Sequence, residues 1–260
     1  MVRSADGTRI GFAQVGSGSL PLVIVHGALT GADQWLPVAT AMAEHCTCYV
    51  MDRRGRGRSD DGADYALERE VEDIEAVLDA AGPGAYLLGH SSGAIYALEA
   101  ARRRPVAGLV LYEPPIHMRR RFDAIFERIQ PLIEEGRNDD AVALFFREEA
   151  GVPDEQLSIM RTTDLWGEMV ALAPTALREW AALLEAGLTV ERYGDLSMPT
   201  LLLTGTLTQD HPSFATRELD ATLPDTRIVT LDGQAHAANR MAPDLLAREV
   251  TEFMLAVARQ

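Results

Sequence analysis

The sequence predicts an α/β fold in which helices cover both faces of a mostly parallel sheet and one helical segment is inserted between two strands. Short apolar runs alternate with segments of helical periodicity along nearly the whole chain, which is typical of parallel sheets. The interval between Pro114 and Ser197 breaks this alternation, because it contains several amphipathic helical stretches and no convincing strand. A sheet with one helical insertion explains both features.

Seven apolar runs are expected to form strands, since each is short and is bounded by turn residues. They are Arg9 to Gln14, Leu22 to Val25, Cys46 to Met51, Tyr86 to Leu88, Gly108 to Tyr112, Thr200 to Thr204 and Arg227 to Leu231. Five intervening segments have the length of crossover helices: Asp33 to Glu44, Glu68 to Ala81, Ser92 to Arg103, His211 to Thr222 and Pro243 to Arg259.

The insertion, residues 114–195, is expected to form a helical cap. Residues 1–113 and 196–260 then form the core. Amphipathic stretches within it include Arg120 to Glu135 and Pro174 to Ala186. A simple crossover needs far fewer residues. Because ligand sites of α/β folds form at the carboxyl ends of the strands, we expect this segment to act as a lid over a pocket.

The charge composition excludes several classes of function. The chain has 260 residues and a formal net charge of −15, and all of its 24 basic residues are arginine. An acidic protein repels phosphate backbones and anionic membranes, so neither nucleic acid nor a membrane is an expected partner. Without lysine, Schiff-base chemistry and the P-loop lysine are excluded.

The first 20 residues contain no apolar core of a signal peptide, and no apolar run approaches the ~20 residues that span a bilayer. We therefore expect a cytoplasmic protein. Cys46 and Cys48 lie two apart in a predicted strand and would point to the same face, so buried free thiols are expected.

The segment from Ala85 to Tyr96 combines an apolar run, Gly-His-Ser-Ser-Gly and a helix start rich in small residues. A serine in a Gly-x-Ser-x-Gly turn between strand and helix is a nucleophile elbow, and Ser91 is its central residue. Ser92 lies outside the glycine frame and is the weaker candidate for the nucleophile. The helix that begins at Ser92 would direct its free N–H groups toward the reacting centre.

These residues resemble the α/β-hydrolase superfamily, and the resemblance covers nearly the whole chain. Three further segments carry it: Leu22 to Ala28 with its His-Gly turn, Tyr49 to Ser59 with Asp-x-x-Gly-x-Gly-x-Ser, and Gly233 to His236 after a late strand. The resemblance implies a sheet of the eight-stranded type and an oxyanion hole formed by the backbone amides of Ala28 and Ser92. It also implies that His236 is the general base.

The order of Ser91 before His236 agrees with the Ser…Asp/Glu…His order of this fold. Of the other five histidines, His26 more readily stabilises its turn and His90 occupies a variable position of the elbow. His45, His117 and His211 have no supporting motif.

The acid of the triad departs from the commonest pattern of the family, because Thr208 stands where an aspartate is usual. Two carboxylates could replace it. Glu113 ends an apolar strand and is followed by two prolines, which stiffen its exit. Asp210 lies in the same loop as Thr208, but it precedes His211-Pro212 and has the place of a helix N-cap. We favour Glu113 and keep Asp210 as the alternative.

Other side chains give weaker signals. A pocket could be lined by Trp35, Met118, Phe122 and Trp166, although packing explains apolar residues at helical spacing equally well. The arginines of 53–58 and 119–121 more commonly form solvated faces or ion pairs than an anion site. No cluster of metal ligands is evident, and no cofactor is expected.

The leading hypothesis is hydrolysis of a small carboxylic ester, thioester or lactone through an acyl-enzyme intermediate on Ser91. A serine nucleophile argues against epoxide hydrolase or dehalogenase chemistry, which requires a carboxylate. The alternative is a non-hydrolytic member of the fold that uses the same pocket for ligand binding, lyase or cyclase chemistry, or acyl transfer. The expected partner is a small acyl compound, and the sequence does not indicate an oligomeric state.

Overall fold

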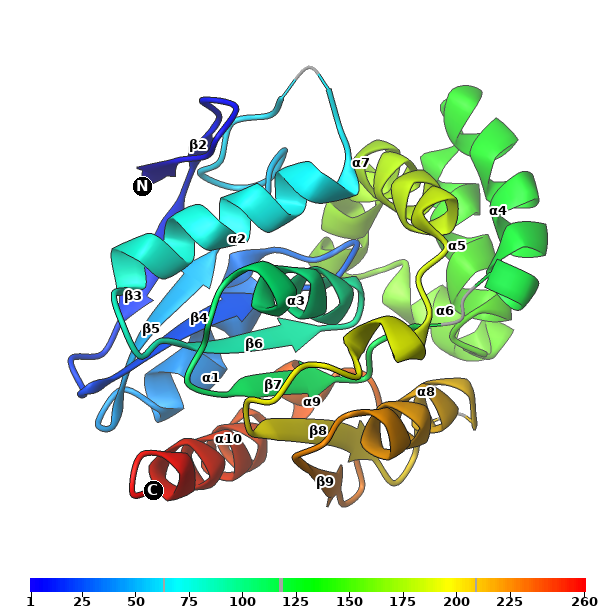
Figure 1. Ribbon diagram of the computed structural model, residues 1–260. Helices are drawn as coiled ribbons and strands as arrows, with labels where there is room; N and C mark the ends of the chain where they lie inside the picture. Colours follow the sequence, from blue (N-terminus) through cyan, green and yellow to red (C-terminus); the bar gives the residue numbers. More distant parts are fainter. Residues whose placement is uncertain (63, 117–118, 209) are drawn as a thin grey trace. The chain divides into compact units, whose positions relative to one another are not determined.

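The computed structural model describes residues 1–62, 64–116, 119–208 and 210–260, and the chain divides into two compact units (Figure 1). The core unit comprises Met1–Gly27, Gly31–Ile116 and Thr189–Gln260. The helical unit comprises Ala28–Thr30 and His117–Leu188. Each unit has a hydrophobic core of its own.

The core unit is built on a seven-stranded sheet with the strand order β3-β5-β4-β6-β7-β8-β9. All neighbours pair in parallel except β3 and β5. The strands are β3 (Phe12–Val15), β4 (Leu20–Val25), β5 (Cys46–Met51), β6 (Tyr86–His90), β7 (Leu109–Tyr112), β8 (Thr200–Gly205) and β9 (Thr226–Leu231). The α/β class and the mostly parallel sheet are therefore confirmed.

The main sheet has seven strands in the described residues instead of the eight that the family resemblance implied. The predicted strand from Arg9 to Gln14 divides at Gly11 into β2 (Arg9–Ile10) and β3, and β2 pairs with β1 (Val2–Arg3) in a separate two-stranded sheet. A Cβ atom at Gly11 would lie 2.4 Å from Cβ of Arg58. The backbone at this glycine thus passes close to the loop after β5, and the pairing is interrupted there.

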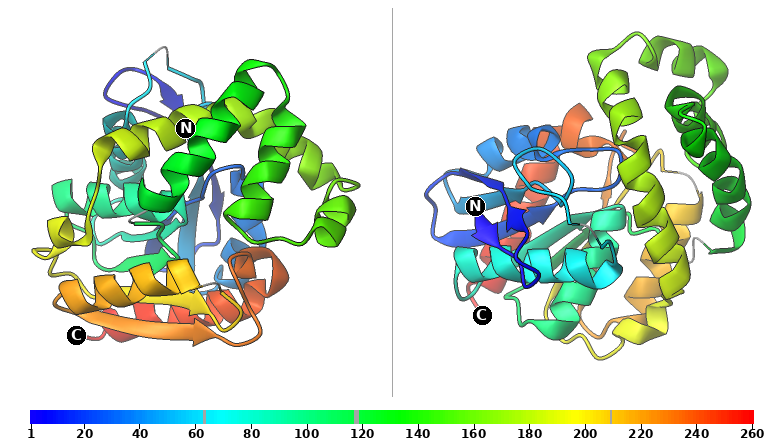
Figure 2. Two further views of the ribbon diagram at one scale, coloured as in Figure 1. Left: turned by 90° about the vertical axis from the view of Figure 1, so that its right-hand side faces the viewer. Right: turned by 90° about the horizontal axis from the view of Figure 1, so that it is seen from above.

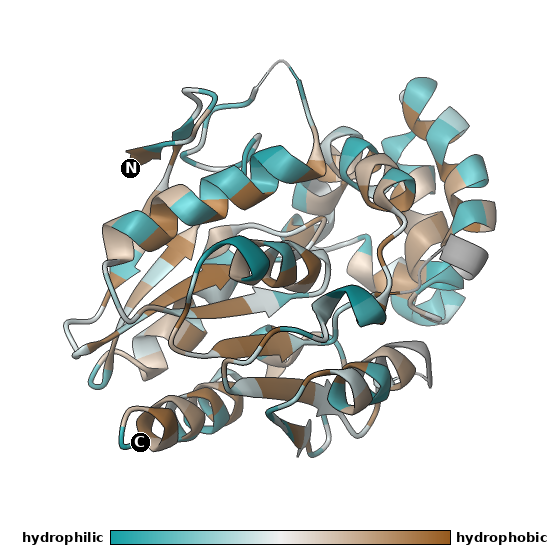
Figure 3. Ribbon diagram, viewed as in Figure 1, coloured by the Kyte–Doolittle hydropathy of each residue, from teal (hydrophilic) through white to brown (hydrophobic). Residues whose placement is uncertain are grey.

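Helices cover both faces of the sheet (Figures 1 and 2). Side chains of α1 (Leu36–Ala41) and α10 (Pro243–Val257) share a buried cluster with Leu22 and Ile24 of β4. Alternate residues of a strand point to opposite faces, so Val23 and Val25 face the other layer, where α2 (Leu67–Ala81) and α3 (Ser92–Arg103) pack together. The strands of the seven-stranded sheet are mostly hydrophobic, whereas the helices alternate between polar and apolar faces (Figure 3).

Cys46 and Cys48 are free, fully buried and on the same face of β5, as predicted. The remaining elements of the core unit are η1 (Ala32–Trp35), η2 (Val190–Tyr193), α8 (Asp210–Thr222) and α9 (Ala238–Met241). No helix among the described residues is long and apolar enough to cross a bilayer.

The helical unit contains α4 (Arg119–Glu134), α5 (Asn138–Glu148), α6 (Asp154–Met160) and α7 (Asp164–Ala186). It is shorter at both ends than the predicted insertion of residues 114–195. At its carboxyl end the difference has a clear cause. The hydroxyl of Tyr193 donates to Glu99 of α3 at 3.0 Å, and Arg192 forms an ion pair with the same carboxylate at 2.7 Å. These contacts join residues after 188 to the core unit.

Candidate active site

Ser91 occupies the sharp turn between β6 and α3. Its backbone has φ 54° and ψ −129°, a strained conformation for a residue with a side chain. The Ser91 N–H donates to the carbonyl of Tyr112 at 2.9 Å, which ties the turn to the end of β7. A Cβ atom at Gly89 would lie 2.5 Å from Cα of Ala94, and one at Gly93 would lie 2.4 Å from the Val25 carbonyl oxygen. Both glycines of the elbow are therefore required by close backbone packing.

The surroundings of Ser91 support an oxyanion site. Ser92 is the first residue of α3, so its N–H has no partner within the helix, and the positive end of the helix dipole lies beside Ser91. On the neighbouring strand end, a Cβ atom at Gly27 would lie 2.9 Å from Cβ of Ser91. Ala28 follows Gly27 as the first residue of the helical unit, and its role in the oxyanion hole stays a prediction.

His236 and Glu113 form a direct hydrogen bond. Nδ1 of His236 lies 2.6 Å from Oε2 of Glu113, whose side chain is fully buried, whereas that of His236 is 49% exposed. Because a carboxylate can only accept, Nδ1 carries a proton, and Nε2 is the ring nitrogen left to act as a base. This geometry fits the predicted acid at the end of β7. The side chain of the alternative, Asp210, lies outside the described side chains.

The other oxygen of Glu113 is held by the loop after β8. Oε1 accepts from the Gly205 N–H at 3.1 Å, from the Thr204 hydroxyl at 3.5 Å and from the Thr208 hydroxyl in a short hydrogen bond. Thr208 stands where the family most often carries its aspartate. It cannot supply a charge, but it orients the carboxylate that the neighbouring strand supplies.

Tyr112 fixes the loop that carries His236. Its hydroxyl donates to the Ala235 carbonyl and accepts from the Ala238 N–H at 3.1 Å, so it holds the loop on both sides of the histidine. Burial, with a further contribution from the charge of Glu113, raises the pKa of Tyr112, and the hydroxyl therefore keeps its proton. A Cβ atom at Gly205 would lie 2.1 Å from the Gln234 carbonyl oxygen, so β8 also approaches this loop closely.

His90 makes a contact that the sequence did not reveal. Its Nε2 lies 2.9 Å from the carbonyl oxygen of His236, and the two imidazole rings are 4.6 Å apart. Burial, together with the electrostatic effect of the neighbouring His236 imidazole, holds the pKa of His90 well below its usual range. The neutral ring must then carry its proton on Nε2 to donate to the carbonyl. The only sequence cue was its place beside the nucleophile, where side-chain identity varies.

The aromatic residues predicted to line a pocket have packing roles. Trp35 has no exposed surface and belongs to the core of the sheet. Phe122 and Trp166 belong to the separate core of the helical unit, where the Phe122 ring lies 5.4 Å from that of Trp180. Packing therefore accounts for these three side chains without a ligand. Met118 lies outside the described residues.

The arginines of the 53–58 loop are not all solvated. Arg53 and Arg54 are fully buried and form ion pairs with Glu70 at 2.7 Å and with Asp73 at 2.8 Å. The expectation that these arginines form either solvated faces or ion pairs is met by ion pairs for both. The acidic partners lie one turn apart on α2. The side chains of 119–121 lie outside the described side chains.

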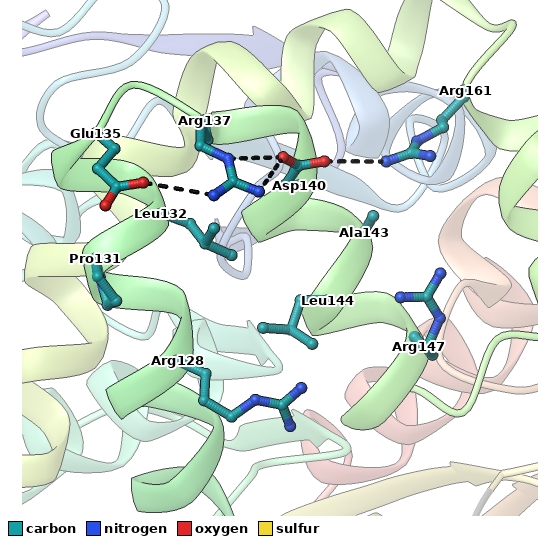
Figure 4. Close-up of a pocket in the computed structure, with 10 residues that line it drawn as sticks. All are labelled: Arg128, Pro131, Leu132, Glu135, Arg137, Asp140, Ala143, Leu144, Arg147 and Arg161. Atoms are coloured by element: carbon teal, nitrogen blue, oxygen red, sulfur yellow. Dashed lines mark hydrogen bonds and ion pairs between the residues drawn. The ribbon is translucent and has the colours of Figure 1, made fainter.

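The helical unit contains an open hollow of about 560 Å³ between α4 and α5 (Figure 4). Each of the four arginines around it has an acidic partner. The ion pairs are Arg128–Glu148, Arg137–Asp140, Arg147–Asp154 and Arg161–Asp139. The hollow contains none of the candidate catalytic residues. Within the part of the chain that the structure describes, no group of three or more His, Cys, Asp or Glu side chains could hold a metal ion.

Comparison with known proteins shows the family of the chain. Residues 22–249 match the model of the alpha/beta hydrolase family. The chain belongs to this family. It is also similar in structure to an alpha/beta hydrolase from Sphaerobacter thermophilus, with a TM-score of 0.87 and 37% identity, covering 97% of this chain and 99% of the other.

Two curated relatives have more specific names. N-formylmaleamate deformylase from Pseudomonas putida is 37% identical over 118 residues, which is 44% of this chain and 44% of the relative. 2-(Acetamidomethylene)succinate hydrolase from Mesorhizobium japonicum is 24% identical over 248 residues, covering 92% of this chain and 89% of the relative. Both names describe hydrolytic enzymes.

Proposed function

We propose that this protein is a serine hydrolase that cleaves a small carboxylic ester, thioester or lactone through an acyl-enzyme intermediate. The observation that carries the proposal is the 2.6 Å hydrogen bond between His236 Nδ1 and the buried carboxylate of Glu113. This bond leaves Nε2 of His236 as the base, and the strained elbow presents Ser91 as the nucleophile.

The proposed reaction has two halves. Nε2 of His236 takes the proton of the Ser91 hydroxyl as Oγ attacks the acyl carbon, and Glu113 stabilises the resulting imidazolium. The amides of Ser92 and Ala28 stabilise the negative charge on the carbonyl oxygen. His236 then protonates the leaving group. Water, activated by the same histidine, releases the acid from Ser91. These steps require only side chains and backbone amides of the chain.

A second candidate is cleavage of an acyl–nitrogen bond. It is favoured by the names of the deformylase and the acetamidomethylene hydrolase, which both denote N-acyl compounds. The same triad serves both reactions, because they differ in the leaving group that His236 must protonate. A non-hydrolytic use of the pocket, in ligand binding, lyase or cyclase chemistry or acyl transfer, is the remaining alternative.

A labelling experiment and a substrate screen test the proposal together. A fluorophosphonate probe should modify wild-type protein at Ser91 and should not modify Ser91→Ala, whereas the neighbouring Ser92→Ala serves as the matched control and should still be labelled. The screen compares short- and long-chain nitrophenyl esters, thioesters, lactones, and N-formyl and N-acetyl amides. Equal labelling of Ser91→Ala, or wild-type turnover by that variant, would refute the assignment. A wild type that is labelled yet cleaves none of these compounds would favour the non-hydrolytic alternative.

A further inference from the structure

The carbonyl group of Gly27 receives two hydrogen bonds from buried side chains. Nδ1 of His26 lies 2.9 Å from this oxygen, and Nη1 of Arg53 donates to it at 3.2 Å. Both side chains are fully buried, so water does not compete for the oxygen from their side. One of the two donors is a permanent cation, because a guanidinium keeps its charge in proteins.

The protonation state of His26 is consistent with this arrangement. Burial, followed by the charges of Arg56 and Arg53, holds the pKa of His26 well below its usual range, so the ring is neutral. The backbone N–H of Arg53 donates to Nε2 of His26 at 3.4 Å. Nδ1 must therefore carry the proton and donate it to the Gly27 carbonyl. Arg53 thus fixes the orientation of that carbonyl directly and also through His26.

Arg53 itself is held rigidly. Glu70 of α2 accepts from its Nε at 3.0 Å and from its Nη2 at 2.7 Å, which is the bidentate geometry of strong guanidinium–carboxylate pairs. The guanidinium also lies 4.5 Å from the ring centre of Tyr96 in α3, and the hydroxyl of Tyr65 donates to Glu70 at 2.9 Å. A cation with this many partners has little freedom to move away from Gly27.

A planar trans peptide links Gly27 to Ala28, so the Gly27 carbonyl and the Ala28 N–H lie on opposite edges of one rigid unit. Whatever fixes the carbonyl also fixes the direction of the N–H. Two donors on the carbonyl further polarise the peptide and strengthen its N–H as a donor. The Ala28 N–H is the amide for which the sequence predicts a role in the oxyanion hole.

We infer that Arg53 is a positioning residue of this hydrolase: through the Gly27 carbonyl it sets the direction and the donor strength of the Ala28 amide. The inference rests on the proposed function, because it assigns Arg53 to the stabilisation of the oxyanion. Its effect belongs to the transition state, where charge develops on the substrate oxygen. Gly27 lies against Ser91, so a tilt of this peptide would occur next to the nucleophile.

The test uses two pairs of buried residues that match closely. Arg53→Met combined with Glu70→Gln removes the guanidinium without leaving a buried carboxylate unpaired. Arg54→Met combined with Asp73→Asn removes an equally buried bidentate pair one turn along α2. The guanidinium of Arg54 donates to Asp6, Asp73 and the Arg69 carbonyl instead of Gly27. Thermal unfolding should show similar losses of stability in the two double variants.

Activity is measured with 4-nitrophenyl acetate and with its thiono analogue, in which sulfur replaces the carbonyl oxygen and accepts hydrogen bonds poorly. The ester-to-thionoester ratio of kcat/KM reports oxyanion stabilisation, which a purely structural role would not change. Removing one oxyanion donor costs ~10²–10³-fold in kcat, so misdirecting one donor should lower ester kcat by ~10-fold or more at little change in KM. The ratio should fall in the Arg53 pair and stay at the wild-type value in the Arg54 pair.

Three outcomes decide the matter. Equal ratios in both double variants and wild type overturn the inference and leave the proposed function intact. A wild type that neither hydrolyses the ester nor is labelled at Ser91 overturns the proposed function and the inference with it. If the Arg53 pair does not fold, Arg53→Lys is used, since one ammonium nitrogen cannot occupy the separate positions of Nε, Nη1 and Nη2 that bond Glu70 and Gly27. An unchanged ratio in that folded variant also overturns the inference.

Discussion

At the residue scale, the hydrogen bonds around Glu113 explain how a threonine can stand where this family most often has an aspartate. A fully buried carboxylate without donors would be strongly disfavoured. Glu113 instead receives donors on both oxygens, from His236 on one and from Gly205 and Thr208 on the other. The loop after β8 therefore still serves the acid, although it does not supply the charge.

The first prediction concerns this acid. Glu113→Gln should lower the acylation rate by up to ~10⁴-fold, because an amide at this position no longer stabilises the imidazolium or fixes the productive tautomer. Asp210→Asn should leave the rate nearly unchanged and cost at most ~1 kcal/mol of stability if the residue is a helix cap. Single-turnover kinetics with both variants distinguishes the two, and a collapse confined to Asp210→Asn would move the acid to α8.

The sequence predicts a site residue when its role is indicated by residues next to it in the chain. It does not predict a role that depends on contacts with residues far along the chain. Ser91, His236 and Glu113 are marked by their own neighbours: a glycine frame, a turn after a strand, and an apolar run before two prolines. No neighbouring residues in the sequence indicate the roles of His90 and Tyr112. Their contacts with the His236 loop exist only because parallel pairing brings the ends of distant strands together.

At the element scale, the turn that carries Ser91 depends on how closely α3 approaches the strand β4. A Cβ atom at Gly93, in the first turn of α3, would lie 2.4 Å from the Val25 carbonyl oxygen and 2.5 Å from that of His26. Both neighbours are backbone atoms, one at the end of β4 and one directly after it, which cannot move as a side-chain end can. The helix axis, and with it the direction of its N-terminus, is fixed by this contact.

The second prediction follows from that contact. Gly93→Ala should destabilise the fold by roughly 1–3 kcal/mol through overpacking and should reduce labelling of Ser91. Gly167→Ala in α7 is the control, because a Cβ atom there would meet nothing within 4 Å. Alanine has the higher helix propensity, so the control should be stabilised by up to ~1 kcal/mol. Urea unfolding measures both, and a tolerated Gly93→Ala with full activity would contradict the prediction.

The sequence predicted helices and strands most accurately where the apolar periodicity and the boundary residues indicated the same ends. The helices α2 and α3 and the strand β5 begin and end within one or two residues of their predicted bounds. The predicted helix from Asp33 to Glu44 instead divides into η1 and a shorter α1. Pro37 lies in the first turn of α1 and has no N–H to continue a hydrogen-bonded helix from η1. The proline therefore outweighed the length of the segment, which suggested one continuous helix.

At the scale of the whole molecule, the buried ion pair of Arg53 and Glu70 links stability to acid pH. Although burial alone would raise the pKa of Glu70, the charge and hydrogen bonds of Arg53 lower it below its usual value. A carboxylate with a lowered folded-state pKa stabilises the fold above its unfolded pKa of about 4.3, and this contribution is lost as the pH falls through the folded-state value.

The third prediction is that Arg53→Met combined with Glu70→Gln makes stability less dependent on acid pH. The stability of wild-type protein should fall more steeply below about pH 4.3, by up to ~1.4 kcal/mol per pH unit for the single proton that Glu70 takes up on unfolding. Urea titrations at successive pH values between neutral and strongly acidic give both slopes. Parallel curves for the two proteins would show that the lowered pKa of Glu70 does not contribute.

The division into two units leads to the last prediction, which is that the helical unit opens more readily than the sheet. The unit is small, and small units bury a lower fraction of their surface. Two of its helices carry an internal proline, Pro131 in α4 and Pro174 in α7, and each proline removes one helical hydrogen bond. Segments that open to admit ligands come from the less stable parts of a fold.

Hydrogen exchange should therefore show amides of α4 to α7 opening at a free energy ~2 kcal/mol or more below those of β4 and β6, with α10 as the helical control in the core unit. If the helical unit also acts as the lid that the sequence predicts, modification of Ser91 by a phosphonate should slow exchange in α4 to α7 and leave α10 unchanged. Equal protection of the helical unit and β4 in both states would contradict a lid that opens and closes.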